Sequence, residues 1–289
     1  MTTVLKLGGE LLEDQDAVQA AARATARLAS GGRLVVVHGG GRAIDAELRA
    51  RGETPRFVDG LRITDAAALD AVVAVLAGRT NTSFVAALGT MGTRAVGLTG
   101  ADGGIGLCSR VAPFESVSGD VVDLGLVGEP ADPDARLLDD LLTLGCLPVV
   151  ASLGITREGA LLNVNADVLA AHLAVALGAH RLIVAGGTAG VLDANSRTLP
   201  SVSVDDVDAM AASGAAHSGM VAKLNACRYA LTRGVSEVFI VSGRHAADYA
   251  SAPGTRIVPR TNGNTSIGTN GAPVTEPAAN SAPRREMTA

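Results

Sequence analysis

Short apolar segments alternate with longer alanine-rich segments along most of this chain of 289 residues. The apolar segments are typical of strands buried on both faces, and the alanine-rich ones of helices. The alternation is typical of βαβ units and predicts an α/β fold, a three-layer αβα sandwich around a mostly parallel central sheet. We predict strands at 3–7, 33–38, 95–98, 147–151, 182–185 and 237–241, and helices at 16–29, 43–51, 66–76, 81–88, 134–144, 166–177, 204–213 and 220–233.

Glycine follows almost every predicted strand, as in Gly8-Gly9, Gly39-Gly40-Gly41 and Gly186-Gly187. The carboxyl ends of parallel strands form one edge of a sheet, and ligands bind there. Because glycine lets backbone N–H groups approach a ligand closely, several such loops on one edge indicate an anion site.

A weak pause near Gly178 predicts a boundary between an N-terminal lobe, 1–178, and a C-terminal lobe, 179–260. From 261 to 289 the sequence turns to Asn, Gly, Thr, Pro and Ala without periodicity, which predicts a disordered tail without chemistry.

Composition narrows the classes of function. The net charge of −5 and the 2% of aromatic residues argue against nucleic acid and anionic membranes as partners. No run approaches about 18 uninterrupted apolar residues, and no signal peptide is recognisable. Cys108, Cys146 and Cys227 have neither disulfide nor zinc spacing. We therefore expect a cytoplasmic protein that acts on small molecules.

Lys6 lies inside an apolar strand immediately before Gly8-Gly9. A buried ammonium group needs an anionic partner, although a lone lysine more often extends its charged end from an edge strand to the solvent. The adjacent glycine loop favours a bound anion as that partner.

The second glycine loop, His38-Gly39-Gly40-Gly41, joins a strand to a helix. Its free N–H groups and the helix dipole suit an anion, although a tight turn alone explains a triple glycine. The loop matches neither the dinucleotide fingerprint nor the Walker A motif.

Gly60 to Asp65 (GLRITD) places Arg62 just before a helix that Thr64 or Asp65 can cap. Arg62 can pair at the surface, but its planar guanidinium also suits a substrate carboxylate.

The run Asn163 to Asp167 (NVNAD) precedes another helix, and Lys223 lies in a further apolar helix. Asn and Asp are the usual helix caps, so this run has a purely structural interpretation. A carboxylate that holds both Lys6 and Lys223 is the functional interpretation.

Over about residues 2–260 the chain resembles the amino-acid kinase family, and most of all the members that phosphorylate N-acetyl-L-glutamate in arginine biosynthesis. Single motifs are weak, but their order is specific. The motifs are Lys6-Leu7-Gly8-Gly9, His38–Gly41, GLRITD, Gly78 with Asn81, DLGLVGE at 123–129, NVNAD and GMVAK at 219–223.

The resemblance implies transfer of the γ-phosphoryl group of ATP to a side-chain carboxylate, with Mg²⁺ bridging phosphate oxygens and no metal ion ligated directly by the protein. Lys6 and Lys223 would stabilise the transferring group, and Asp167 would orient both. The phosphate oxygens would accept hydrogen bonds from backbone N–H groups of the two glycine loops. The substrate would contact the second loop and the side chains of Arg62 and Asn163. The residues implied in these contacts are Gly8, Gly9, Gly40 and Gly41 for phosphate; Gly40, Gly41, Arg62 and Asn163 for the substrate; and 191–193 for the nucleotide. By the same resemblance the N-terminal lobe, 1–178, would bind the amino-acid substrate and carry the phosphate loops, and the C-terminal lobe, 179–260, would bind the nucleotide.

Two positions depart from the family pattern. Gly186-Gly187-Thr188 stands where the family commonly has an acidic residue, and Ala101 where many relatives have lysine. The first departure leaves the nucleotide contacts at this turn open.

Three alternatives remain at this level: a sibling kinase acting on carrier-linked aminoadipate or glutamate or another small carboxylate, a non-catalytic amino-acid-binding regulator, and a nicotinamide-dependent oxidoreductase. The intact Lys6, Asp167 and Lys223 disfavour the second, and the missing fingerprint disfavours the third. The resemblance also implies a homodimer that L-arginine does not inhibit, because no helix precedes the first strand.

Overall fold

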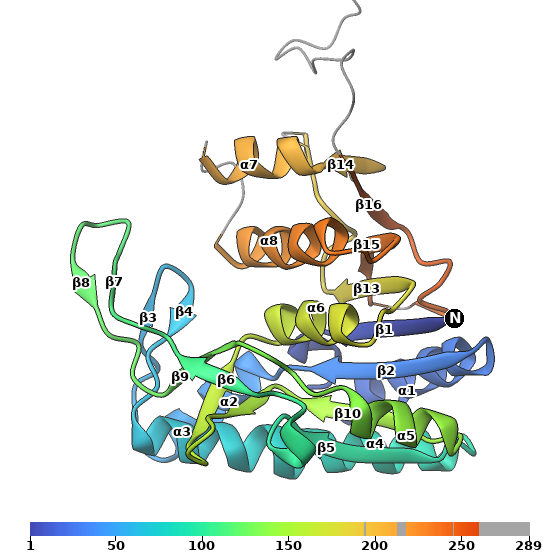
Figure 1. Cartoon of the computed structure of the whole chain (residues 1–289), viewed down its shortest axis with the longest axis horizontal. Helices are drawn as coiled ribbons and strands as arrows, with labels where there is room; N and C mark the ends of the chain where they lie inside the picture. The colour runs from blue at the N-terminus through green and yellow to red at the C-terminus, as the bar shows by residue number, and fades with distance from the viewer. Residues whose placement is uncertain (194, 213–217, 245, 260–289) are drawn as a thin grey trace, which may run out of the picture.

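The computed structural model describes residues 1–193, 195–212, 218–244 and 246–259. Within these residues an eight-stranded sheet runs through the molecule in the order β14-β16-β15-β13-β1-β2-β10-β5 (Figure 1). The strands from β15 to β5 are parallel, and β16 pairs antiparallel with β15. Their bounds are β14 Ser201–Ser203, β16 Gly254–Val258, β15 Glu237–Ser242, β13 Arg181–Gly186, β1 Thr2–Leu7, β2 Arg33–His38, β10 Leu147–Ala151 and β5 Ala95–Thr99.

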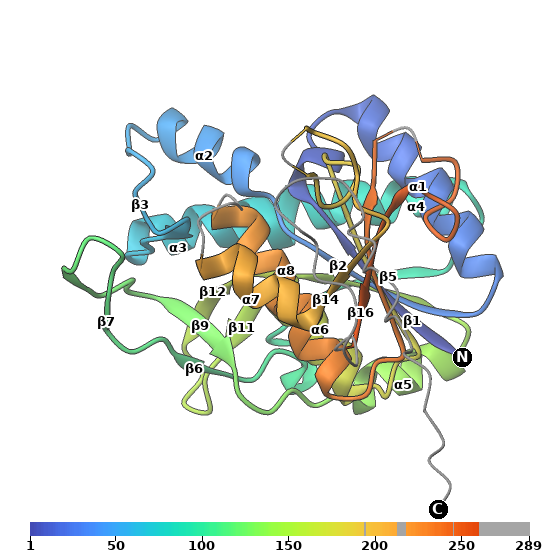
Figure 2. The same cartoon turned by 90° about the horizontal axis from the view of Figure 1, so that it is seen from above.

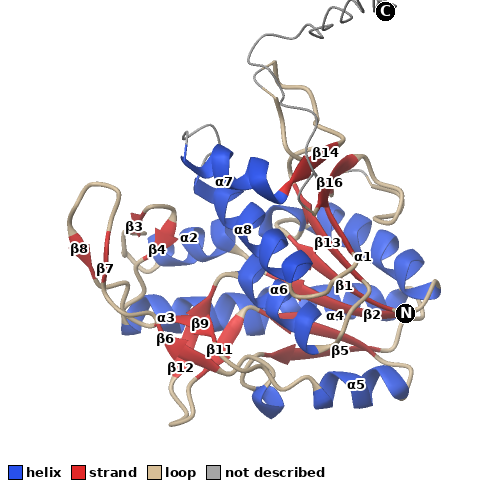
Figure 3. Ribbon diagram, turned by 45° about the horizontal axis from the view of Figure 1, so that its top comes forward, coloured by secondary structure: helices blue, strands red, loops and turns tan. Residues whose placement is uncertain are grey.

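Helices cover both faces of this sheet (Figures 2 and 3). Alternate residues of β1 enter two cores: Leu5 packs with α1 and α4, whereas Val4 packs with α5, α6 and α8. This is the three-layer sandwich predicted from the sequence, and the prediction is confirmed. The helices are α1 Gln15–Ser30, α2 Gly41–Ala50, α3 Ala66–Val73, α4 Asn81–Thr90, α5 Arg136–Thr143, α6 Ala166–Ala176, α7 Val204–Ala212 and α8 Ser218–Thr232.

The predicted strands and helices all occur, with ends shifted by a few residues, but one break is wrong. The helices predicted at 66–76 and 81–88 form one continuous helix, because a π-helical segment, Ala74–Thr80 (η2), joins α3 to α4. The helix Ala66–Thr90 is long and apolar enough to pass a test for membrane spans, yet half of its most apolar window is buried in the molecule. That burial is typical of a core helix.

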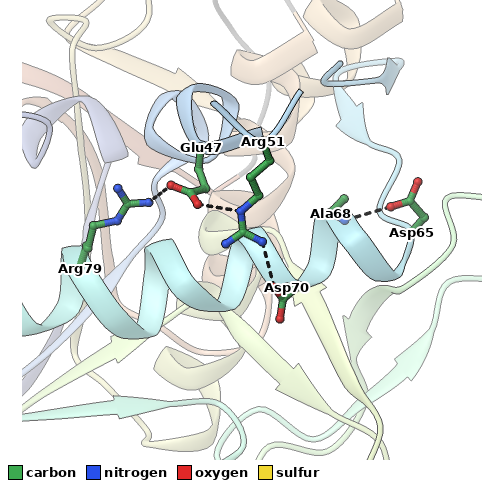
Figure 4. A network of polar contacts seen from close by, with 6 residues as sticks. All are labelled: Glu47, Arg51, Asp65, Ala68, Asp70 and Arg79. Carbon is green, nitrogen blue, oxygen red and sulfur yellow. Dashed lines mark hydrogen bonds and ion pairs between the residues drawn. The ribbon is translucent and has the colours of Figure 1, made fainter. Parts of the chain in front are cut away.

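Polar contacts fasten α2 to this long helix (Figure 4). Glu47 accepts hydrogen bonds from Arg51 and Arg79, and Arg51 also donates to Asp70. Asp65 caps α3 by accepting the N–H of Ala68 at 2.9 Å, as predicted for one of two candidate residues. The position of α2 matters because the triple-glycine loop leads directly into it.

A second sheet, which the sequence did not predict, lies at the carboxyl edge of the first. Its order is β11-β12-β9-β6, with β11 Leu153–Ile155, β12 Leu161–Val164, β9 Val127–Pro130 and β6 Cys108–Arg110. Two hairpins project at the same end of the molecule (Figures 1 and 3), namely β3 Phe57–Val58 with β4 Leu61–Arg62, and β7 Phe114–Glu115 with β8 Val121–Val122.

The division into lobes at residue 178 stays a prediction. Gly178 ends α6 with φ +53°, and the next strand, β13, pairs directly with β1, so the main sheet continues across this point. The tail predicted at 261–289, together with residue 260, lies outside the described residues.

Candidate active site

A buried ion pair lies at the carboxyl end of β1. Lys6 Nζ is 2.8 Å from Asp167 Oδ1, and the two side chains are only 7% and 9% exposed. Lys6 falls on the same face of β1 as Val4, because side chains alternate along a strand. It therefore points toward α6 and meets the first turn of that helix.

The start of α6 explains why Asp167 is free to meet Lys6. Asn165 caps the helix, with its side-chain oxygen accepting the N–H groups of Asp167 and Val168 at 2.8 and 3.2 Å. The structural role considered for the NVNAD run thus belongs to Asn165. Asp167 Oδ1 is buried and accepts no hydrogen bond from any described residue, so its contact with Lys6 is electrostatic and leaves an acceptor unused.

Lys223 approaches the same place from α8. A methyl group on Gly186 would lie 3.8 Å from Lys223 Nζ, which places the ammonium beside the end of β13. Burial raises the pKa of the Cys227 thiol, Asp167 raises it further, and Lys6 and Lys223 oppose them, so all three charges lie near this thiol. Among the described ion pairs, however, Asp167 holds Lys6 and not Lys223, contrary to the expectation that it orients both.

The two lysines carry a signal that the motif analysis missed. The chain has 24 basic residues of the Lys and Arg types, and Lys6 and Lys223 are its two lysines. Everywhere else the sequence uses the larger, planar guanidinium. The chain therefore uses lysine, with its compact ammonium group, only where the side chains of Lys6 and Lys223 converge.

The two glycine loops touch each other. A methyl group on Gly9 would come within 2.6 Å of Gly40 Cα, so the loops can meet only without side chains. Gly41 begins α2, and its N–H is one of those that a helix leaves without an internal partner. Gly8 was expected to donate to phosphate, but its N–H already donates to the Ala185 carbonyl at 2.8 Å, which argues against that role.

His38 holds the triple-glycine loop from inside the protein. The Asn81 amide N–H₂ faces the Val149 carbonyl at 2.9 Å and lies 3.0 Å from His38 Nε2, so this ring nitrogen is the acceptor. The ring proton is then on Nδ1, which lies 3.2 Å from the Gly39 carbonyl. Burial lowers the pKa of His38 to about 4, so the ring is neutral.

Arg62 reaches the same loop from the β3–β4 hairpin. Its Nη2 donates to Asp45 at 2.5 Å and to the Gly41 carbonyl at 3.2 Å, and its guanidinium lies 4.6 Å from the Phe57 ring centre. Its second terminal nitrogen, Nη1, is buried and has no hydrogen-bond partner among the described residues. A buried donor without a partner is costly, so Nη1 suits an anionic ligand.

Asn163 lies on β12 and joins this region to the second sheet. Its Nδ2 donates to Thr64 Oγ1 at 3.1 Å, and the Thr64 carbonyl in turn accepts the N–H of Leu126 at 2.7 Å. Gly125 fits beneath Thr64 with φ +76°, where a methyl group would come within 2.4 Å of the Thr64 carbonyl oxygen. The three motifs GLRITD, DLGLVGE and NVNAD therefore meet.

Two acidic residues were missed by the sequence analysis. Asp45 pairs with Arg62, but its helix gave no specific signal. Glu10 follows Gly8-Gly9 within an apolar run, and the reasoning applied to Lys6 could have found it. Its Oε1 accepts the N–H of Gly187 at 2.7 Å, so a carboxylate lies at the turn where the sequence lacks an acidic residue.

Residues 191–193, expected to contact nucleotide, form a turn. Asp193 accepts hydrogen bonds from the backbone N–H groups of Asn195 and Arg197, so its carboxylate has a local structural role. A groove of about 880 Å³ lies elsewhere between α1, α2 and the long helix, and neither lysine lines it.

Comparison with known proteins places this fold in a family. A family model described as "Amino acid kinase family" matches residues 1–242. The chain is 39% identical over 248 residues to an acetylglutamate kinase of Acidiphilium cryptum, covering 84% of this chain and 83% of the relative. The acetylglutamate kinase of Methanoculleus marisnigri is also 39% identical, with 84% and 86% covered.

A solved structure supports the same assignment. The N-acetylglutamate synthase of Neisseria gonorrhoeae, crystallised with coenzyme A and N-acetyl-glutamate, superimposes with a TM-score of 0.76 at 25% identity, covering 90% of this chain and 60% of that one. The chain therefore belongs to the amino acid kinase family, as its ordered motifs indicated. Within that family it is similar to proteins named acetylglutamate kinase.

The buried neutral ring of His38 predicts a pH-dependent stability. Between about pH 6.5 and pH 4 the unfolded chain binds a proton on this residue that the folded protein does not, so stability falls as the pH falls. The full effect is about 3 kcal/mol in the free energy of unfolding. Urea unfolding of the wild type and of His38→Asn across this range should show a shallower pH dependence in the variant.

Titration of the His38 ring by NMR gives a second measurement that does not depend on the variant folding. A ring that becomes protonated near pH 6.5 in the folded protein would contradict the assignment.

Proposed function

We propose that this protein transfers the γ-phosphoryl group of ATP to the side-chain carboxylate of N-acetyl-L-glutamate, a step of arginine biosynthesis. The observation that carries the proposal is the convergence of Lys6, Asp167 and Lys223 at glycine loops, with the partly unpaired Arg62 attached to one of those loops. The relatives named acetylglutamate kinase support the choice of substrate.

The reaction needs positioning and positive charge more than proton transfer. The substrate carboxylate is already a nucleophile; its oxygen forms a bond to the γ-phosphorus while the bond to the β-γ bridging oxygen breaks, leaving ADP. Lys6 and Lys223 stabilise the charge on the transferring group, and Asp167 fixes Lys6. The free N–H groups of Gly9, Gly40 and Gly41 are the proposed donors to phosphate oxygens.

Arg62 and Asn163 hold the substrate at its other end. Arg62 Nη1 is the buried donor that lacks a partner, and the guanidinium is fixed by Asp45 and the Gly41 carbonyl. Both residues connect to Thr64 and the NVNAD run, so the bound carboxylate and the lysine pair are held by one framework.

Mg²⁺ enters the site with the nucleotide. The described residues contain no group of three side chains suited to hold a metal ion by themselves, which favours binding through phosphate oxygens. Such an ion neutralises phosphate charge. The C-terminal lobe, with 191–193, is the proposed nucleotide site, and contacts there would come from the backbone because Asp193 is engaged locally.

A homodimer is the proposed assembly. The long helix exposes Ala66, Ala67 and Ala86 and leaves Leu69 and Val73 half-buried, an apolar face that a second copy would cover. The three cysteines are free, as expected of the reducing cytoplasm in which we place the protein.

An acid panel tests the reaction. With MgATP, trapping acyl phosphate as hydroxamate should give product from N-acetyl-L-glutamate in preference to aspartate, glutamate and 2-aminoadipate. Product from another acid alone would indicate a sibling kinase, and the absence of product from every acid would indicate a non-catalytic regulator.

Substitution of the two lysines tests their role in the reaction. Lys6→Ala and Lys223→Ala should each lower kcat by about 10²-fold or more with little change in the KM of the amino-acid substrate, since the stabilisation that the lysines give grows in the transition state.

Substitution of Arg62 tests the substrate contact. Arg62→Lys should raise the KM for N-acetyl-L-glutamate by about tenfold or more and leave that for ATP unchanged, because an ammonium cannot reproduce the planar contacts. Arg56→Lys, in the same region but 55% exposed, is the matched control and should change neither constant. A rise in the ATP constant instead would assign Arg62 to the nucleotide.

Light scattering tests the dimer. The wild type should have the mass of two chains, and Ala67→Glu should dissociate it because a charge would be buried without a partner. Acidic residues are tolerated in the first turn of a helix, so the fold should survive. Ala160→Glu, at an exposed alanine in the turn between β11 and β12, should leave the dimer intact; a monomeric wild type would refute the assembly.

A further inference from the structure

The loops around Gly8-Gly9, Gly40-Gly41 and Gly186-Gly187 form a glycine cradle, and Glu10 places a carboxylate inside it. Besides accepting the Gly187 N–H at 2.7 Å, it folds over Gly8 so closely that a methyl group there would lie 2.5 Å from Oε2. A methyl group on Gly186 would lie 3.3 Å from its Oε1 and 3.8 Å from Lys223 Nζ, so the carboxylate and the ammonium flank one glycine.

The carboxylate is ionised there. Burial raises the pKa of Glu10, but hydrogen bonds from its own N–H and that of Gly187, with the charges of Lys6 and Lys223, outweigh burial and hold the pKa below its usual value of 4.5. Among the ion pairs of the described residues, Glu10 takes part in none. Two backbone hydrogen bonds and two nearby positive charges hold it, and no ion pair with a described lysine fixes it in place.

We propose that the Glu10 carboxylate occupies a phosphate position of the cradle in the free protein and that nucleotide phosphate must displace it. This inference rests on the proposed function, since it takes the cradle to be the phosphate site. A phosphate oxygen and this carboxylate compete for the same N–H and the same two lysines. Two anions at that spacing repel each other, so the side chain leaves when phosphate enters.

A cavity next to Glu10 can accept the displaced side chain. Glu10 lines a cavity of about 540 Å³ whose wall includes Arg42 and Arg244. Rotation about its side-chain bonds would carry the carboxylate from the lysines toward these guanidinium groups. Without ligand, Glu10 would thus keep the net charge of the lysine cluster near zero. When nucleotide binds and Glu10 moves away, the positive charge of Lys6 and Lys223 would become available to the phosphate.

Calorimetry on the full chain tests the competition. The probes are the imido analogue of ATP with MgCl₂, and sodium pyrophosphate without metal. Glu10→Gln removes the charge at nearly constant size, and Glu10→Ala empties the position. Both variants should bind both probes about tenfold more tightly than the wild type. Glu53→Gln, which removes an exposed carboxylate just beyond the C-terminal end of α2, is the control for the loss of one negative charge and should bind as the wild type does.

The outcomes are distinct. A folded wild type that binds neither probe would refute the phosphate site itself, and with it the proposed function. Unchanged affinity in the Glu10 variants, or an equal gain in Glu53→Gln, would overturn the competition while leaving the kinase assignment intact. Weaker binding of the magnesium complex, with pyrophosphate unchanged, would also overturn it, because Glu10 would then act on the metal ion. Thermal unfolding of each variant confirms that it is folded.

Discussion

The burial of Lys6 against Asp167 is the constraint on which the rest of the site depends. Taking both charges out of water costs free energy that their attraction scarcely returns, so the pair is a poor source of stability. It needs an apolar strand to carry the lysine, a helix start to present the carboxylate, and a separate cap to free that carboxylate. β1, α6 and Asn165 meet these three needs, and the order of the motifs along the chain follows from them.

The glycine loops lie beside the buried pair of Lys6 and Asp167 and are held in place by several contacts. Gly9 and Gly40 pack backbone against backbone, His38 and Asn81 fix the second loop from the interior, and Arg62 is tied to its last glycine. The lysine pair and Arg62 therefore belong to one rigid assembly, although they come from three separate segments. Such rigidity suits a reaction that depends on placing two anions in line.

Much of the architecture could be predicted from the sequence, because buried parallel strands and alanine-rich helices leave strong patterns. The second sheet and the hairpins could not, since strands of two to four residues such as Phe57–Val58 carry no periodicity. The break placed between 76 and 81 was wrong because a π-helical segment, which no sequence pattern had indicated, carries the chain through it. For the site, sequence could name Lys6, Asp167 and Arg62 but not the pairing of Arg62 with Asp45, since that contact joins two elements whose packing no local pattern records.

Charge balance explains features that motifs alone leave unrelated. The loop after β13 has glycines where the family commonly has an acidic residue, and Glu10 on the facing loop brings a carboxylate to that place. With Asp167 it sets two negative charges near two lysines, so the empty cluster is close to neutral. Neutrality lowers the cost of burying the lysines, but it also weakens their attraction for phosphate. A carboxylate held by backbone hydrogen bonds and by no ion pair among the described residues reconciles these demands, because it can leave the site more easily than Asp167, which is fixed in the first turn of α6.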